Sequence, residues 1–105
     1  MISTHILDTT SGMPASNVEV KLLKLNGQEW SELEVQKTNA DGRSVFSKAE
    51  NPGVYRLQFM VEDYFSGKES FYTQIPVVFK ITSTNRKYHV PLLLNPFGYS
   101  TYRGS

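Results

Sequence analysis

Two histidines and a polar, aromatic C-terminus are the residues of this chain best suited to chemistry. His5 and His89 are its only histidines, and the last residues, His89 to Ser105, read HVPLLLNPFGYSTYRGS. An imidazole titrates near neutrality and can act as an acid, a base or a metal ligand. Either histidine alone would favour an ordinary hydrogen-bonded role, so chemistry requires that the fold bring the two together.

Other kinds of site lack the residues they need. The 105 residues include no cysteine, which excludes disulfides and thiolate-bound zinc or iron. Two histidines without a third fixed ligand make a poor zinc site, so we expect no metal. The chain has no glycine-rich phosphate loop, no Gly-x-Ser-x-Gly motif and no closely paired catalytic carboxylates. Its eleven basic and ten acidic residues are scattered, so we expect no nucleic-acid partner.

The sequence also lacks membrane and secretion signals. Its longest apolar runs, PVVF and VPLLL, are far shorter than the roughly 20 residues of a membrane span. MISTHILD at the N-terminus has neither the basic nor the apolar region of a secretory signal. We therefore expect no membrane partner and a cytoplasmic location, with a processed periplasmic or peroxisomal form as the alternative.

Strands, rather than helices, must position the histidines. Apolar residues alternate with polar ones in VEVKLLKL and VYRLQF, and turn residues such as Asn26-Gly27 and Asp41-Gly42 separate the runs. We expect strands at 2–8, 17–25, 30–37, 43–47, 53–60, 73–82, 86–94 and 98–103, and one short helix within 61–67. The expected fold is an all-β, antiparallel sandwich of about eight strands. Its core should hold the aromatic residues Trp30, Phe46, Phe59 and Phe79.

The alternation of the strand over 86–94 predicts where His89 points, because successive residues face opposite sides of a sheet. One set is bulky and apolar throughout and should face the core: Tyr88, Val90 and Leu92. His89 then points outward, beside Pro91 and Leu93. The same alternation places His5 on the face of Leu7.

An outer face with two histidines and several apolar side chains is unusual for a monomer. Ser100 and Tyr102 share a face of the last strand and add to this surface. A second copy, related by a two-fold axis, is the cover we expect. Two such faces would enclose a cleft, and clefts between subunits favour small ligands.

Three stretches carry a family resemblance: STHILDTTSGMPA at the start, NADGRS in the middle and YHVPLLLNPFGYSTYRGS at the end. They resemble the 5-hydroxyisourate hydrolase family, the purine-catabolic relatives of transthyretin. The resemblance covers essentially the whole chain and implies one prealbumin-like domain over residues 1–105. Transthyretin lacks the histidine pair and the terminal Tyr-Arg-Gly-Ser, which favours the enzyme branch.

The resemblance implies a homotetramer with active sites in a channel at the dimer–dimer interface. Members of the family hydrolyse 5-hydroxyisourate to 2-oxo-4-hydroxy-4-carboxy-5-ureidoimidazoline without a metal or an organic cofactor. Their catalytic residues fall on His5, Arg43 and His89. Substrate contacts are expected from His5 and Arg43 and from the terminal residues Ser100, Tyr102, Arg103, Gly104 and Ser105.

Roles within this group follow from the chemistry of each side chain. A mostly neutral histidine suits proton removal from water, a role we assign to His89, with His5 completing the relay in an order that stays open. Arg43 would stabilise the developing oxyanion, although an arginine after an Asp-Gly turn is by itself more often a solvated edge residue. Arg103 and the Ser105 carboxylate should hold the last strand in register, the carboxylate meeting a nearby arginine.

Two other functions remain open at this point. A carrier of a small aromatic ligand would use the same channel without needing the histidine pair. A monomeric adhesin-like module would have no channel at all.

Overall fold

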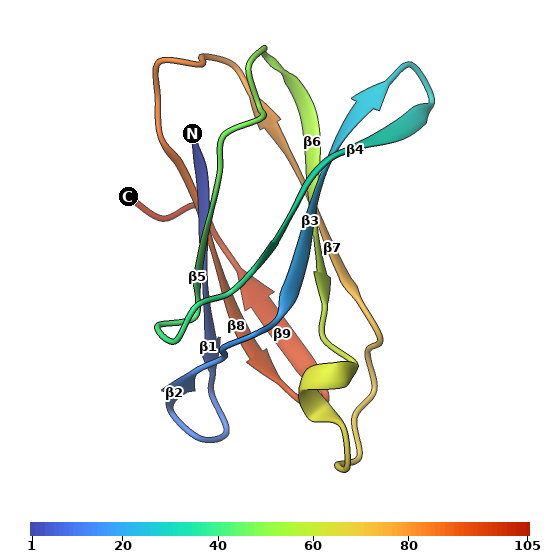
Figure 1. Cartoon of the computed structure of the whole chain (residues 1–105), viewed down its shortest axis with the longest axis vertical. Coiled ribbons are helices and arrows are strands. Elements are labelled where there is room, and N and C mark those ends of the chain that lie inside the picture. Colours follow the sequence, from blue (N-terminus) through green and yellow to red (C-terminus); the bar gives the residue numbers. More distant parts are fainter.

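The computed structural model describes residues 1–105 as two β-sheets packed face to face (Figure 1). One sheet, at the left of Figure 1, contains β1 (Ile2–Asp8), β2 (Met13–Pro14), β5 (Arg43–Phe46), β8 (Tyr88–Asn95) and β9 (Gly98–Thr101). The other contains β3 (Glu19–Asn26), β4 (Glu29–Lys37), β6 (Gly53–Met60) and β7 (Ile75–Ile81). The all-β sandwich expected from the sequence is confirmed.

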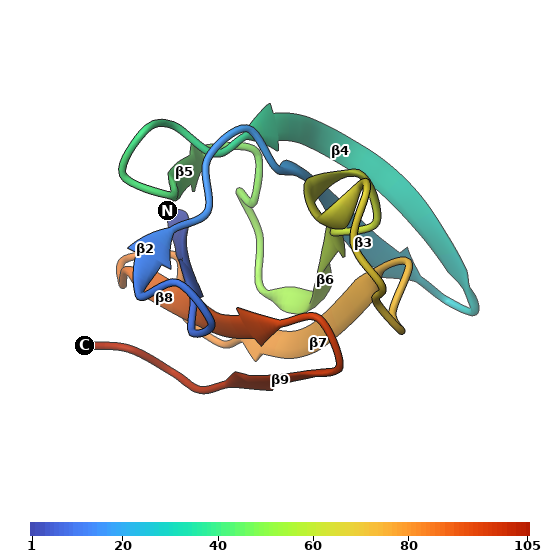
Figure 2. The same cartoon turned by 90° about the horizontal axis from the view of Figure 1, so that it is seen from below.

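The sheet that holds both histidines has the order β2-β1-β8-β9, with β5 also paired to β1. The second sheet has the order β4-β3-β6-β7. Every pairing is antiparallel except that of β1 with β8, which is parallel. A parallel pair needs a crossover connection, and here the whole second sheet lies between the two strands in the sequence. The first strand, β1, and the last, β9, belong to this sheet, so both chain termini lie beside it (Figure 2).

All eight expected strands are present, each within two residues of the expected bounds, and β2 is additional. The helix expected within 61–67 is a single 3-10 turn, η1 (Asp63–Phe65). No helix in the structure has the length and apolar character needed to span a membrane.

The last strand is shorter than expected, because β9 ends at Thr101. Its register with β8 places Thr101 opposite Leu92, and the isolated bridge between Gly104 and His89 continues that register. Pro91, which lies opposite Tyr102 in this register, has no N–H to donate and interrupts the ladder. The Thr101 hydroxyl instead donates to the Pro91 carbonyl over 2.7 Å.

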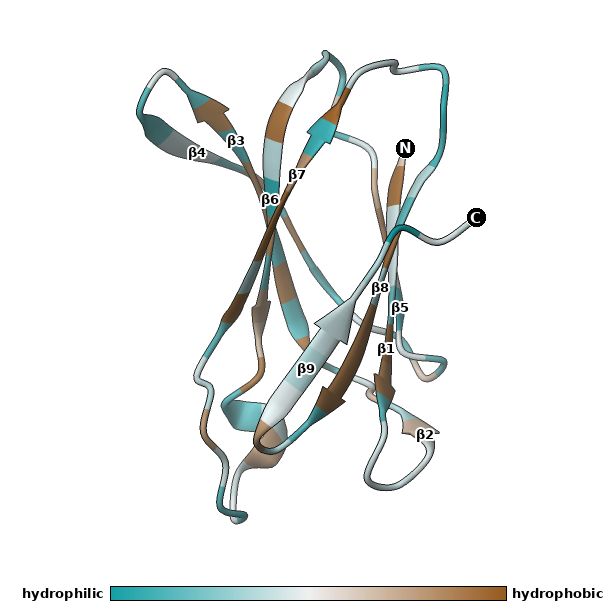
Figure 3. Ribbon diagram, turned by 180° about the vertical axis from the view of Figure 1, so that it is seen from behind, coloured by the Kyte–Doolittle hydropathy of each residue, from teal (hydrophilic) through white to brown (hydrophobic).

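The core is a cluster of 19 buried apolar residues between the sheets. It includes Tyr88, Val90 and Leu92, as the alternation predicted, while His89 lies half-buried on the opposite face of β8. Pro91 shares the outer face with His89 but is buried, because the C-terminal residues cover it. In Figure 3, β8 is brown along most of its length and the neighbouring β9 is pale.

The prediction that Trp30 belongs to the core was wrong. Its ring is half-buried and lies under the guanidinium of Arg56, 4.5 Å from the ring centroid. Arg56 alternates in β6 with two fully buried residues, Tyr55 and Leu57, so it points away from the core and holds Trp30 on the outer face. The other predicted core aromatics contact the core: Phe46 and Phe59 are fully buried, and Phe79 packs against it.

A buried carboxylate closes the end of β1. Asp8 accepts hydrogen bonds from the backbone N–H groups of Thr10 and Ser11, and from the Tyr64 hydroxyl of η1 over 2.7 Å. Burial alone would raise the pKa of Asp8, but these hydrogen bonds outweigh it and lower the pKa below its usual value. Burial, together with the contact with Asp8, raises the pKa of Tyr64 to about 12. Asp8 thus joins the turn after β1 to η1, which follows β6 of the other sheet.

Candidate active site

Three adjacent strands place His5, His89 and Arg43 on one outer face. His5 lies opposite Arg43 in the antiparallel pair of β1 and β5. In the parallel pair of β1 and β8, Ser3 lies opposite His89 and His5 lies opposite Pro91. The two histidines therefore lie on neighbouring strands, offset by two positions in the register, on the side that faces away from the core.

His89 is held on both sides of its ring. The Ser3 hydroxyl lies 2.8 Å from Nδ1. The Gly104 N–H donates to the His89 carbonyl over 2.8 Å, and a Cβ on Gly104 would stand only 2.5 Å from Cδ2 of the ring. The backbone of Gly104 thus lies directly against the imidazole, and this approach leaves no room for a side chain at position 104.

The surroundings of His89 favour its neutral form. Burial lowers its pKa below the usual 6.5, and the positive charge of Arg43 and the neighbouring His5 lower it further. A neutral imidazole has one nitrogen with a lone pair and can accept a proton at neutral pH. His89 therefore has the charge state that a general base needs.

Arg43 is presented by a tight turn between β4 and β5. The Asn39 side-chain oxygen accepts hydrogen bonds from the N–H groups of Asp41 and Arg43 at 2.9 and 3.0 Å. Gly42 has φ +73°, and a Cβ there would stand 2.6 Å from the Ile6 carbonyl oxygen. Glycine is required at this position because both the backbone conformation and the close approach exclude a side chain. Arg43 itself is exposed and forms no ion pair.

The C-terminal residues lie beside His89 but differ in part from the expectation. The Arg103 guanidinium stacks over the Tyr88 ring, 4.9 Å from its centroid, and so anchors the C-terminus to β8. The expected ion pair of the Ser105 carboxylate with an arginine is wrong, since the only ion pair joins Lys21 and Glu32. That expectation assumed a regular strand up to residue 103, whereas β9 ends at Thr101.

The remaining terminal residues lie on the solvent side. Ser100 is exposed and lies opposite Leu93. Tyr102 is 56% exposed and borders a small pocket of about 140 Å³. The lining of this pocket combines the edge of the sandwich with the terminus: Val77, Phe79, Lys80, Tyr88, His89, Val90, Tyr102 and Arg103.

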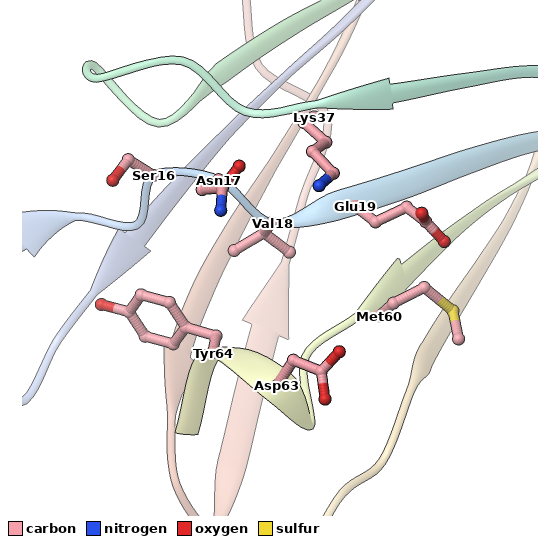
Figure 4. A pocket seen from close by; sticks show the side chains of 8 residues that line it. All are labelled: Ser16, Asn17, Val18, Glu19, Lys37, Met60, Asp63 and Tyr64. Carbon is pink, nitrogen blue, oxygen red and sulfur yellow. The ribbon is translucent and has the colours of Figure 1, made fainter. Parts of the chain in front are cut away.

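A larger hollow of about 450 Å³ lies elsewhere, between the start of β3 and η1 (Figure 4). Its charged groups are Glu19, Lys37 and Asp63, and it contains no histidine or arginine. These residues were not singled out by the sequence, and the hollow lacks the imidazole pair and the guanidinium of the histidine face. The histidine face is therefore the better candidate for catalysis, although the pocket beside it is smaller.

Ser3 is the residue of this face that sequence reasoning missed. A signal for it exists in ISTHILD, because Ser3 precedes His5 by two positions and must share its face. Its contact with His89, however, depends on the pairing of residues 86 positions apart.

A family model described as the HIUase/Transthyretin family matches residues 2–104. The chain belongs to this family. It is 46% identical over 111 residues to 5-hydroxyisourate hydrolase of Mus musculus, with 99% of this chain and 94% of the mouse protein covered.

Three solved structures resemble the whole fold. The structure of Klebsiella pneumoniae 5-hydroxyisourate hydrolase is 40% identical with a TM-score of 0.86, covering 99% of this chain and 97% of that one. Sea bream transthyretin in complex with thyroxine is 29% identical with a TM-score of 0.91, covering 98% and 93%. An (S)-allantoin synthase is 33% identical with a TM-score of 0.88. The match covers 99% of this chain but only 43% of that longer protein.

Proposed function

We propose that this protein hydrolyses 5-hydroxyisourate to 2-oxo-4-hydroxy-4-carboxy-5-ureidoimidazoline, a step between urate and allantoin. The observation that carries this proposal is the placement of His5, His89 and Arg43 on one face by three adjacent strands. Full-length relatives named 5-hydroxyisourate hydrolase, at up to 46% identity, support the same activity.

The reaction begins with attack of a water oxygen on a ring amide carbonyl. His89 accepts a proton from that water as the new C–O bond forms, for which its neutral state is suited. The tetrahedral intermediate then collapses, the ring C–N bond breaks, and the departing nitrogen takes up a proton. His5 serves the relay at one of these two proton transfers.

Arg43 stabilises the oxyanion that develops on the attacked carbonyl. Its guanidinium is exposed, has no carboxylate partner and projects from the strand beside His5. A planar guanidinium offers several N–H donors in fixed geometry to an oxygen-rich substrate. The absence of an ion pair leaves those donors free for the ligand.

The terminal residues complete the substrate contacts. Tyr102 offers an exposed phenol beside His89, and Ser100 offers an exposed hydroxyl on the neighbouring strand. Arg103 lines the same pocket as His89, and Gly104 lies against the imidazole. With Ser105, which follows them, they are proposed to contact the substrate. No metal or organic cofactor takes part in the proposed reaction.

The active form is proposed to be a homotetramer with its sites at the dimer–dimer interface. The outer face that carries the histidines also exposes apolar and aromatic side chains, among them Val45 at 52% and Tyr102 at 56%. Leu93 lies beside them, only half-buried. A second copy of the same face would cover this surface and enclose the histidines in a channel. The cytoplasmic location expected from the sequence stays a prediction.

A carrier of a small aromatic ligand is the second candidate, favoured by the similarity to sea bream transthyretin in complex with thyroxine. The two functions are separated by mixing the protein with fresh 5-hydroxyisourate and following its ultraviolet absorbance. The enzyme accelerates the decay above the spontaneous rate. Decay at the spontaneous rate would rule out the hydrolase and favour the carrier function.

Replacing His89 with alanine tests the catalytic assignment. Loss of a general base should lower kcat by about 10² to 10⁴. Circular dichroism should still report the native fold, because His89 lies outside the 19-residue core. A variant that keeps the native rate would show that His89 is not the base.

A further inference from the structure

Ser3 makes the only side-chain hydrogen bond of His89. The two residues lie directly opposite each other in the parallel pair of β1 and β8, with the Ser3 Oγ atom 2.8 Å from Nδ1 of the imidazole. This contact occupies one ring nitrogen. Only Nε2 is then available to a water molecule in the cleft.

The direction of this hydrogen bond decides whether His89 can be a base. A neutral imidazole carries its proton on one nitrogen and a lone pair on the other. If Nδ1–H donates to Ser3, then Nε2 holds the lone pair and can accept a proton from water. If the Ser3 hydroxyl donates instead, then Nε2 carries the proton and has no basic site to offer.

The opposite side of the ring is fixed by Gly104. Its backbone approaches so closely that a Cβ there would stand 2.5 Å from Cδ2, the carbon bonded to Nε2. A half-turn of the ring would exchange Nδ1 with Cδ2 and place a carbon against the Ser3 hydroxyl, which would lose its partner. The ring orientation is therefore set by two elements, β1 and the C-terminus.

We propose that Ser3 is a positioning residue that accepts a hydrogen bond from Nδ1–H of His89 and so keeps Nε2 unprotonated toward the substrate. This inference rests on the general-base role proposed for His89. It adds a residue from β1 that does not touch the reacting atoms and acts only through the imidazole.

Nitrogen NMR of the native protein tests the tautomer without any substrate. With only two histidines, a His5→Gln variant assigns the ¹⁵N signals of His89. We expect the shift pattern of a protonated Nδ1 and an unprotonated Nε2 at neutral pH. The reverse pattern would overturn the inference even if the enzyme proved fully active. If His89→Ala kept the native rate, the general-base role would be wrong, but the tautomer measured by NMR would not change. The two failures are therefore distinguishable.

Substitution of Ser3 gives a second, independent readout. Ser3→Ala should lower kcat by about 10-fold, as expected for one hydrogen bond, with KM nearly unchanged. Ser3→Thr retains a hydroxyl and should restore most of the rate. Ser31→Ala is the matched control, since its hydroxyl also accepts a side-chain hydrogen bond but lies on the other sheet.

The pKa of His89 in Ser3→Ala has a predicted sign. A hydroxyl that accepts from Nδ1–H bonds more strongly to the charged imidazolium, so its removal should lower the pKa. A hydroxyl that donates bonds only to the neutral ring, so its removal would raise the pKa. A rise in pKa, or a failure of Ser3→Thr to recover activity, would contradict the positioning role.

Discussion

Replacing Gly104 with alanine should push the His89 imidazole out of its place. The new Cβ would stand 2.5 Å from Cδ2 and 3.2 Å from Cγ of Pro91, whereas carbon atoms in contact lie about 3.5–4.0 Å apart. The ring or the C-terminus must therefore shift by about 1 Å. A displacement of that size at a catalytic group can lower the rate by about 10²-fold, or about 2.7 kcal/mol in the barrier.

The assay is the ultraviolet decay of 5-hydroxyisourate, measured for kcat and KM alongside the melting temperature. Gly98→Ala is the matched control, because it lies on the same hairpin and the nearest atom to its Cβ, on Asn95, is 3.8 Å away. The control should keep the native kcat, and Gly104→Ala should lose most of it. An unchanged kcat in Gly104→Ala would refute the argument that this glycine holds the base in position.

Four further predictions concern pH and stability. The lowered pKa of His89 should place the acid limb of kcat/KM below 6.5, so activity persists further into acid than for a free histidine; a limb above 6.5 would contradict this. Tyr64→Phe should cost about 1–3 kcal/mol in urea unfolding, because it removes a partner of the buried Asp8 carboxylate. The lowered pKa of Asp8 stabilises the fold above its unfolded value of about 3.9, and the native protein should lose this contribution as pH falls below it. Ser44→Ala should be neutral or stabilising in the same unfolding measurement, since the buried Ser44 hydroxyl has no hydrogen-bond partner.

The direction of each site histidine could be predicted from alternation alone. Within one strand, successive side chains point to opposite faces of the sheet. His5, which precedes the buried Ile6, and His89, between the buried Tyr88 and Val90, therefore had to face outward. The position of Trp30 could not be predicted in this way, because its ring packs against Arg56, a side chain on a different strand. Bulk and hydrophobicity indicated a core residue, and a cross-strand stack placed it outside.

The C-terminal residues show the same division. The sequence favoured a strand up to residue 103, and the pattern on either side of Pro91 does support pairing at Thr101 and Gly104. The missing N–H of Pro91 interrupts the ladder between them, and the expected carboxylate–arginine pair is replaced by the stack of Arg103 on Tyr88. Both corrections depend on which residues lie opposite each other.

By itself the sequence determined the fold class, the alternating core and the inventory of groups able to move a proton, because these follow from composition and from patterns within single strands. Only the tertiary structure decided that Ser3 meets His89, that Arg43 lies beside His5 and that Gly104 closes on the imidazole. Those contacts join residues 15 to 86 positions apart, as in the pairs 89/104 and 3/89, and they depend on the register between strands. Register is a property of the assembled sheet, since it is set by the packing of all strands at once.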